Sequence, residues 1–140
     1  SPDILGDIHA LPFPDSSEEA ILCISVLEHV ENPIEAANEL YRVLKPNGYL
    51  FLYIPFLFYY HAEAGYYKDY WRFTHDTIEL LFKKFSHREY MPVRGALASW
   101  VHLSPLGRIG LLAYTARLLD SLLGKEKSKQ VSGYYVFLKK

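Results

Sequence analysis

The sequence predicts an α/β protein built on a mostly parallel sheet with flanking helices. Residues 19–26 (EAILCISV) and 48–54 (GYLFLYI) are near-continuous apolar runs, typical of parallel strands that bury both faces. Residues 32–44, between them, carry apolar side chains at helical spacing. A strand, a helix and a strand with short connections form a right-handed βαβ unit, so the two strands are expected to be parallel.

The bulk composition limits the class of protein. With 140 residues, half of them hydrophobic, the chain is expected to form a single domain over residues 1–140 with a real core. A net charge of −1 gives no electrostatic case for nucleic acid as a partner. The single cysteine, Cys23, excludes an internal disulfide. We expect a cytoplasmic protein without a transmembrane segment, because the apolar run 49–60 is too short to span a bilayer and contains Pro55.

The central helix has clear boundary residues. Asn32 is a good N-cap, and Pro33 suits the first helical position. The stretch 45–48 (KPNG) is expected to end the helix, because Pro46 cannot continue it and Asn47 or Gly48 tolerates a left-handed conformation.

Other elements are predicted with less detail. A short strand is expected over residues 2–8, and an aromatic-rich loop over one end of the sheet at residues 59–73. Further on, we expect a helix that Thr74 caps, a strand over 88–93, a helix over 106–123 and a closing strand over 133–138. The helix over 106–123 also suits a membrane surface, although a packed helix is the more frequent use of such a pattern.

Ligands of open parallel sheets bind beyond the carboxyl ends of the strands. This rule selects three stretches as candidate site regions: residues 7–10, 25–31 and 55–72. Four motifs lie in or beside them: D-x-x-x-L-P-F-x-D from Asp7, V-L-E-H-V-x-N-P from Val26, E-L-x-R-V-L-K-P-N-G from Glu39, and H-x7-D-Y-W-R-F-T from His61.

Together these motifs resemble the class I S-adenosylmethionine-dependent methyltransferases of the small-molecule type, over residues 7–85. The resemblance implies part of a Rossmann-like methyltransferase sheet whose last strand is antiparallel, and S-adenosylmethionine as the cofactor. By resemblance, Asp7 accepts a hydrogen bond from the adenine amino group and the Ile8 backbone N–H faces the ring. Ser25, Val26 and Leu27 line the methionine part of the cofactor.

The chemistry implied is an in-line displacement at a sulfonium methyl, in which the protein aligns the acceptor and excludes water. A general base is needed only if the acceptor keeps its proton until attack, and His29 and His61 are the candidates. The expected acceptor is a small molecule, a lipid or a glycan.

The acceptor pocket is expected to use Tyr60, Tyr67, Tyr70 and Arg72. Structural alternatives stay open for the two histidines. His29 could instead be a residue that approaches the central helix and is bonded to the backbone. His61 could instead join Asp69 and Arg72 in a structural ion-pair network. The histidines also lack the close spacing of metal ligands, so no metal site is expected.

Departures from the family pattern shape the functional expectation. Glu18-Glu19 and Asn47-Gly48 stand where the family usually has Phe-Asp and Gly-Gly, and the sequence holds no G-x-G-x-G pattern. We therefore expect an N-terminally incomplete methyltransferase domain, a fragment with weak or no cofactor binding. The alternative is a non-catalytic binding or assembly module derived from a methyltransferase. An exposed sheet edge would allow dimerisation.

Overall fold

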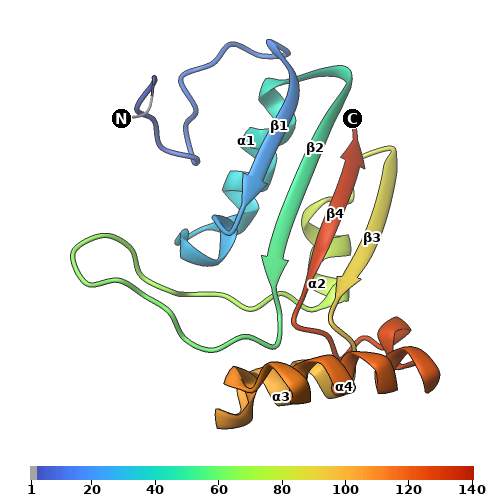
Figure 1. The fold of residues 1–140 in the computed structure, drawn as a ribbon. Helices are drawn as coiled ribbons and strands as arrows, with labels where there is room; N and C mark the ends of the chain where they lie inside the picture. The colour runs from blue at the N-terminus through green and yellow to red at the C-terminus, as the bar shows by residue number, and fades with distance from the viewer. Residues whose placement is uncertain (1–2) are drawn as a thin grey trace.

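The computed structural model describes residues 3–140, and a sheet of four strands forms the central layer of that part of the chain (Figure 1). Its elements are, in order, β1 (Glu18–Ile24), α1 (Pro33–Val43), β2 (Leu44–Pro55), α2 (His75–Leu81), β3 (His87–Val93), α3 (Ala96–Leu103), α4 (Gly110–Leu122) and β4 (Gly133–Lys139). Short 3-10 turns occupy Leu27–His29, Pro105–Arg108 and Lys125–Lys127.

The strands lie in the order β1-β2-β4-β3. β1 and β2 are parallel, and β4 runs antiparallel to both of its neighbours, β2 and β3. Three strands therefore point in one direction and the last strand of the sequence points in the other, as Figure 1 shows. This confirms the predicted α/β class and the antiparallel last strand, which is inserted between β2 and β3.

The helix α1 begins as the sequence predicts. The Asn32 side chain accepts a hydrogen bond from the Glu35 backbone N–H at 3.2 Å, and Pro33 is the first helical residue. α1 and α2 lie on the same side of the sheet (Figure 1). The core between these layers is formed by alternate residues of β2 and β4 with side chains from both helices, among them Leu50, Leu52, Ile54, Leu40 and Ile78.

The opposite face of the sheet corrects the expectation that the two parallel strands bury both faces. Leu22 of β1 is 77% exposed and Ile24 is 46% exposed. In β2, Leu50 and Leu52 are fully buried, whereas Tyr49 on the other face is 43% exposed. The physical reason is that α1 and α2 share one face and β1 is an edge strand, so the described residues leave much of the second face uncovered.

Other boundaries differ from the expectation. β2 begins at Leu44, before the expected start, and Asn47 takes the left-handed conformation (φ 65°) within it. No strand forms over the described residues of the stretch 2–8, where Asp7 makes only an isolated bridge to Ala10; residue 2 itself lies outside the described residues. The predicted helix over 106–123 is split into a 3-10 turn and α4, and α3 was not predicted.

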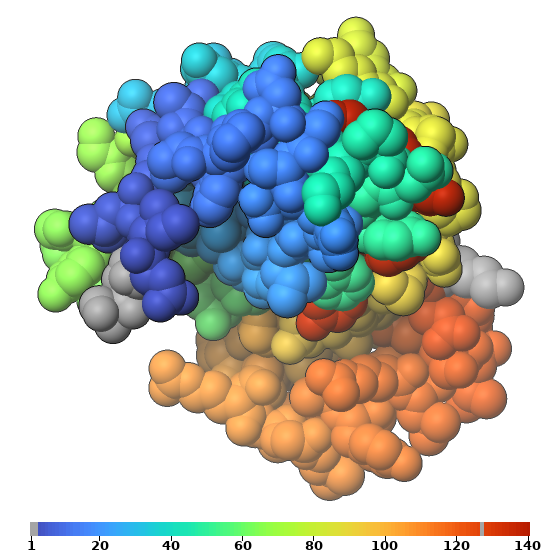
Figure 2. All heavy atoms as spheres, turned by 90° about the horizontal axis from the view of Figure 1, so that it is seen from above, coloured from blue at the N-terminus to red at the C-terminus, as the bar shows by residue number. Residues whose placement is uncertain are grey.

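α3 and α4 pack against each other near the ends of the strands, and Figure 2 shows them (orange) as a layer that projects beside the sheet. Their contact depends on Asp120 of α4, whose buried carboxylate accepts from the Leu97 and Ala98 N–H groups, each at 2.9 Å. α3 has no side-chain cap of its own at Gly95, so Asp120 supplies one. A Cβ at Gly95 would lie 2.4 Å from the Asp120 carboxyl carbon, so the approach requires glycine.

We expect Asp120→Ala to destabilise the chain by about 1–2 kcal/mol, because two N–H groups of α3 lose their acceptor. Urea unfolding measures the free energy, and hydrogen exchange should show faster exchange of the Leu97 and Ala98 amides. Ser121→Ala, an exposed change on the same helix, is the control. Equal stability of the two variants would contradict the capping role.

Candidate functional site

The candidate site lies beyond the carboxyl ends of β1 and β2, where the chain enters the Leu27–His29 turn and the long loop 56–74. Ser25 follows β1 in a left-handed conformation (φ 53°), which redirects the chain into the turn. The loop is tied to this turn by backbone bonds, since the Tyr70 and Trp71 N–H groups both donate to the Glu28 carbonyl, at 2.8 and 3.2 Å. The Trp71 indole N–H donates to the Val30 carbonyl at 2.8 Å. The loop is therefore fixed over the end of the sheet, as predicted.

Two adjoining hollows open here. The inner pocket, of about 450 Å³, is lined by Ser25, Glu28, Tyr53, Phe58 and His61. The outer groove, of about 1260 Å³, is lined by Asp7, Ile8, Glu31, Tyr60 and Tyr70. Val26, His29, Val30 and Tyr67 line both, so the two hollows share a wall.

Most of the residues selected from the sequence meet in these hollows. Asp7, Ile8, Tyr60 and Tyr70 lie in the outer groove, Ser25 and His61 in the inner pocket, and Val26, His29 and Tyr67 in both. The other two do not line either hollow. The Leu27 side chain is 2% exposed and belongs to the core. The Arg72 guanidinium donates to Asp69 and to the carbonyls of Phe58 and Tyr59.

Asp7 is held by a neighbour. Its Oδ1 accepts from the His9 backbone N–H at 2.9 Å and lies 2.7 Å from His9 Nδ1. These hydrogen bonds, that of the backbone N–H first, lower the pKa of Asp7. Its side chain is otherwise exposed to the outer groove, so a negative charge stands at one end of this hollow.

His61 is positioned by an ion pair. The Asp69 side chain is fully buried, binds the Arg72 guanidinium and accepts from the His61 backbone N–H at 2.8 Å. Chiefly because Arg72 donates to it, the pKa of Asp69 falls to about 2. His61 Nδ1 lies 3.1 Å from Asp69 Oδ2 and 3.1 Å from the Tyr59 carbonyl oxygen.

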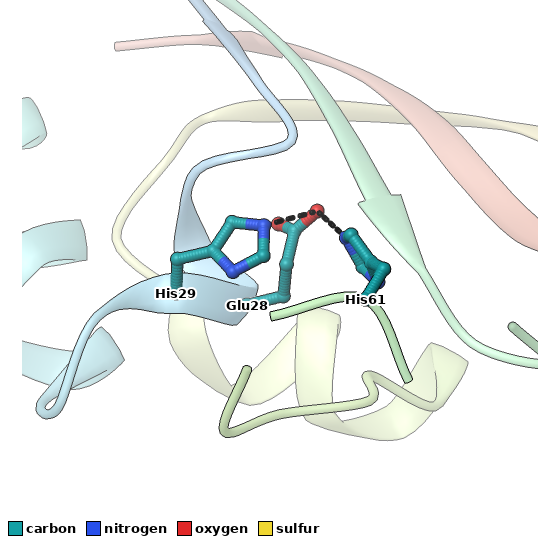
Figure 3. A group of neighbouring side chains, drawn as sticks. All are labelled: Glu28, His29 and His61. Carbon is teal, nitrogen blue, oxygen red and sulfur yellow. Dashed lines mark ion pairs between the residues drawn. The ribbon is translucent and has the colours of Figure 1, made fainter. Parts of the chain in front are cut away.

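Glu28 is the site residue that sequence reasoning did not select, although it lies within the stretch 25–31. Its side chain is 1% exposed, and its carboxylate lies between the rings of His29 and His61 (Figure 3). Its Oε1 is 3.8 Å from His29 Nε2 and 4.0 Å from His61 Nε2. Burial raises the pKa of Glu28 above its usual value. An acidic residue two positions after the apolar run 19–26 was the available signal.

The orientation of both imidazoles is determined by their Nδ1 atoms. His29 Nδ1 is 2.7 Å from the Lys68 carbonyl oxygen, which can only accept, so this nitrogen carries a proton. His61 Nδ1 lies 3.1 Å from each of two acceptors, the Tyr59 carbonyl and Asp69 Oδ2, and 3.5 Å from the donor Arg72 Nη2, so the two shorter contacts favour a proton on Nδ1. In each neutral ring the lone pair is therefore on Nε2, the nitrogen that faces Glu28 and the inner pocket.

The fold and the position of these hollows define an α/β protein of the Rossmann-like class with a ligand site beyond its strand ends. A family described as "methyltransferase domain" matches residues 2–52. An uncharacterized methyltransferase of Schizosaccharomyces pombe is 46% identical over 46 residues, which are 33% of this chain and 16% of that protein. A ubiquinone/menaquinone biosynthesis C-methyltransferase of a Ruegeria species is 45% identical over 47 residues, 34% of this chain and 19% of that protein.

The similarity of fold extends further along the chain. The crystal structure of an S-adenosylmethionine-dependent methyltransferase of Thermotoga maritima, a possible histamine N-methyltransferase, superposes with a TM-score of 0.61 at 22% identity. The match covers 96% of this chain and 62% of that one. The chain thus spans less than two thirds of the relatives it matches. These findings agree with the resemblance drawn from the motifs: residues 2–52 match a methyltransferase domain, and the fold of most of the chain is that of solved S-adenosylmethionine-dependent methyltransferases.

Asp69→Asn tests the ion pair beneath His61. The pKa of Asp69, about 2, lies below its usual 3.8, so the carboxylate stabilises the fold above about pH 4 and this contribution is lost as the pH falls towards 2. We expect the free energy of unfolding of wild type, measured with urea, to exceed that of Asp69→Asn by about 2 kcal/mol at pH 7. This difference should shrink at pH 2.5. The exposed Asp3→Asn should show no such difference at either pH. A difference that is independent of pH would contradict the ion pair.

Proposed function

We propose that this site transfers a methyl group from S-adenosylmethionine to an acceptor held in the inner pocket. The observation that supports the proposal best is the shared wall of the two hollows. A ligand in the outer groove and a second one in the inner pocket would meet at Val26, His29 and Tyr67. Catalysis of an in-line transfer consists mainly of such alignment.

The residues of the outer groove fit one side of the cofactor. Asp7 offers a carboxylate whose Oδ2 has no partner among the described residues, as an adenine amino group requires. Ile8 is adjacent, Val26 lines the wall shared with the inner pocket, and Ser25 lies just beyond that wall, so the methionine part would lie near Val26 and Ser25. S-adenosylmethionine, when bound, supplies an electrophilic methyl group on its sulfonium.

The inner pocket would hold and orient the acceptor. Tyr53, Phe58 and Tyr67 give it aromatic walls, which suits a compact acceptor, either a small molecule or the end of a lipid or glycan. The lone pairs on Nε2 of His29 and His61 would take the proton that an acceptor hydroxyl or amine releases. Tyr60 and Tyr70 lie further out and would contact the remainder of the acceptor. Arg72 would act only through the loop that it holds in place.

Two expectations remain predictions. One is a single, N-terminally incomplete domain over residues 1–140, and the other is a cytoplasmic location. Within residues 3–140, no helix is both long and apolar enough to cross a membrane.

Titration calorimetry with the product S-adenosylhomocysteine tests the cofactor site. We expect Asp7→Asn to weaken binding about 10-fold or more, because a charge-assisted hydrogen bond to the adenine amino group is lost. Asp3→Asn removes a nearby exposed carboxylate outside the groove and should bind as wild type does. Equal affinities of the two variants would show that Asp7 does not hold the adenine. A folded chain that binds no product would favour the expected fragment, in which the cofactor site is incomplete.

The uncovered sheet face supports the second candidate, a binding or assembly module. Leu22 and Ile24 expose apolar surface on the edge strand β1, and Met91 and Tyr135 are each 40% exposed. Apolar surface of this kind, next to unpaired strand edges, favours association.

Self-association through this face is therefore expected, and sedimentation velocity measures it. Leu22→Glu should shift the chain towards the monomer because it places a charge on the face that would be buried. Leu80→Glu changes an exposed leucine of α2 and should have no such effect. A chain that is monomeric before substitution would refute association through β1.

A further inference from the structure

Three side chains at the wall between the hollows offer metal-ligand atoms to one point. A carboxylate oxygen of Glu28 and one ring nitrogen each of His29 and His61 all lie within 4.8 Å of one another (Figure 3). They come from two separate segments, the turn after β1 and the loop after β2. We propose that Glu28, His29 and His61 form a binding site for a divalent transition metal, with Zn²⁺ as the best match.

The two imidazoles are held as metal ligands usually are. A ligating histidine typically donates its other ring N–H to a carbonyl or carboxylate, which fixes the tautomer and the ring orientation. His29 does so with the Lys68 carbonyl, and His61 with the Tyr59 carbonyl and Asp69. Both Nε2 lone pairs are thereby directed to the same carboxylate without closing a hydrogen bond to it.

Glu28 gives an independent indication of a missing partner. Its side chain is 1% exposed, and its Oε2 has no hydrogen-bond partner in the part of the chain that the structure describes. A buried carboxylate without partners is costly, and bound metal is one of the ways in which proteins compensate for it. Arg72, whose positive charge acts on Glu28, donates its hydrogen bonds to Asp69 and to backbone carbonyls instead.

The spacing of the ligand atoms suits a cation. Zn–N and Zn–O bonds of about 2.1 Å at tetrahedral angles place neighbouring ligand atoms about 3.4 Å apart. The observed separations from Glu28 Oε1 are 3.8 and 4.0 Å, and all three ligand atoms lie within 4.8 Å of one another, so closing on a metal requires the loop and the turn to approach by roughly half an ångström to 1.5 Å.

The donor set selects the metal. Two imidazole nitrogens and one carboxylate favour Zn²⁺ and similar transition metals over Mg²⁺, which prefers oxygen ligands and retains its water. Three protein ligands also leave at least one coordination position open, as in catalytic rather than structural zinc sites. All three ligands line the inner pocket, so the open position would face its contents.

A metal here would change how the acceptor is activated, and this consequence rests on the proposed function. An acceptor hydroxyl at the open position would lose its proton to solvent, because the cation lowers its pKa. The oxygen would then form its bond to the methyl carbon while the carbon–sulfur bond breaks and its electron pair stays on sulfur. The histidines would hold the metal and would no longer take the proton themselves.

The test is calorimetric titration of Zn²⁺ into the complete chain after treatment with EDTA and dialysis, with no cofactor or acceptor present. We expect about one Zn²⁺ per chain, no comparable binding of Mg²⁺, and affinity for Zn²⁺ reduced more than 100-fold in both His29→Ala and His61→Ala. Removing even an outer partner of a metal ligand typically costs 10–100-fold. His87→Ala, an exposed histidine on β3, is the matched control and should bind as wild type does.

Since a change at the buried Glu28 can disturb folding, the isosteric Glu28→Gln is compared with wild type by circular dichroism before titration. If it is folded, its affinity should fall by a similar factor. Substoichiometric binding, equal affinity in His29→Ala, His61→Ala and His87→Ala, or equal binding of Mg²⁺ would overturn the proposal. Because the readout is metal binding alone, a failure of methyl transfer would leave this result standing. If Zn²⁺ does not bind, the metal-site proposal is overturned, whereas the proposed methyl transfer with a histidine as the base is not.

Discussion

The site depends on one backbone acceptor, the carbonyl of Glu28. It receives the N–H groups of both Tyr70 and Trp71, and it thereby joins the loop after β2 to the turn after β1. Without this junction the loop would extend over solvent, as long connections between strands usually do. With it, His61 is brought next to His29, with ring centroids 4.9 Å apart, and the inner pocket acquires its walls.

The same junction explains why a carboxylate is buried at the wall between the hollows. The Leu27 side chain anchors the turn in the core, and the adjacent Glu28 is carried inward with it. Burial of an acid with one oxygen unpartnered within the described chain opposes folding, so its presence here is better explained by a ligand than by stability. Asp69 and Arg72, in contrast, form an ion pair with each other, and this pair fixes the loop that carries His61.

The sheet is unevenly covered, and this asymmetry separates the chain into two functional surfaces. α1 and α2 build the core on one face, whereas the described residues leave apolar side chains of β1, β2 and β4 partly open on the other. α3 and α4 project beside the sheet and are held together through Asp120 (Figure 2). The candidate ligand site lies at the strand ends, and the proposed self-association uses the uncovered face.

The sequence by itself determined the local elements and the place of the site. The Asn32 cap, the apolar runs of β1 and β2 and the turn chemistry at Asn47 act over a few residues, and such short-range patterns can be recognised in one sequence. The rule for strand ends then placed Asp7, His29 and His61 at one edge of the sheet.

Only the tertiary structure decided which face of β1 is covered, that α3 forms, and that Glu28 lies between two histidines. Which face of the sheet is covered depends on where helices distant in the sequence pack. The N-terminus of α3 is capped by Asp120 of α4, which is 22 or more residues away. His29 and His61 stand 32 positions apart, so their spacing carried no sign of a shared ligand. Proximity of that kind arises when backbone hydrogen bonds fold the loop back, which a linear pattern does not encode.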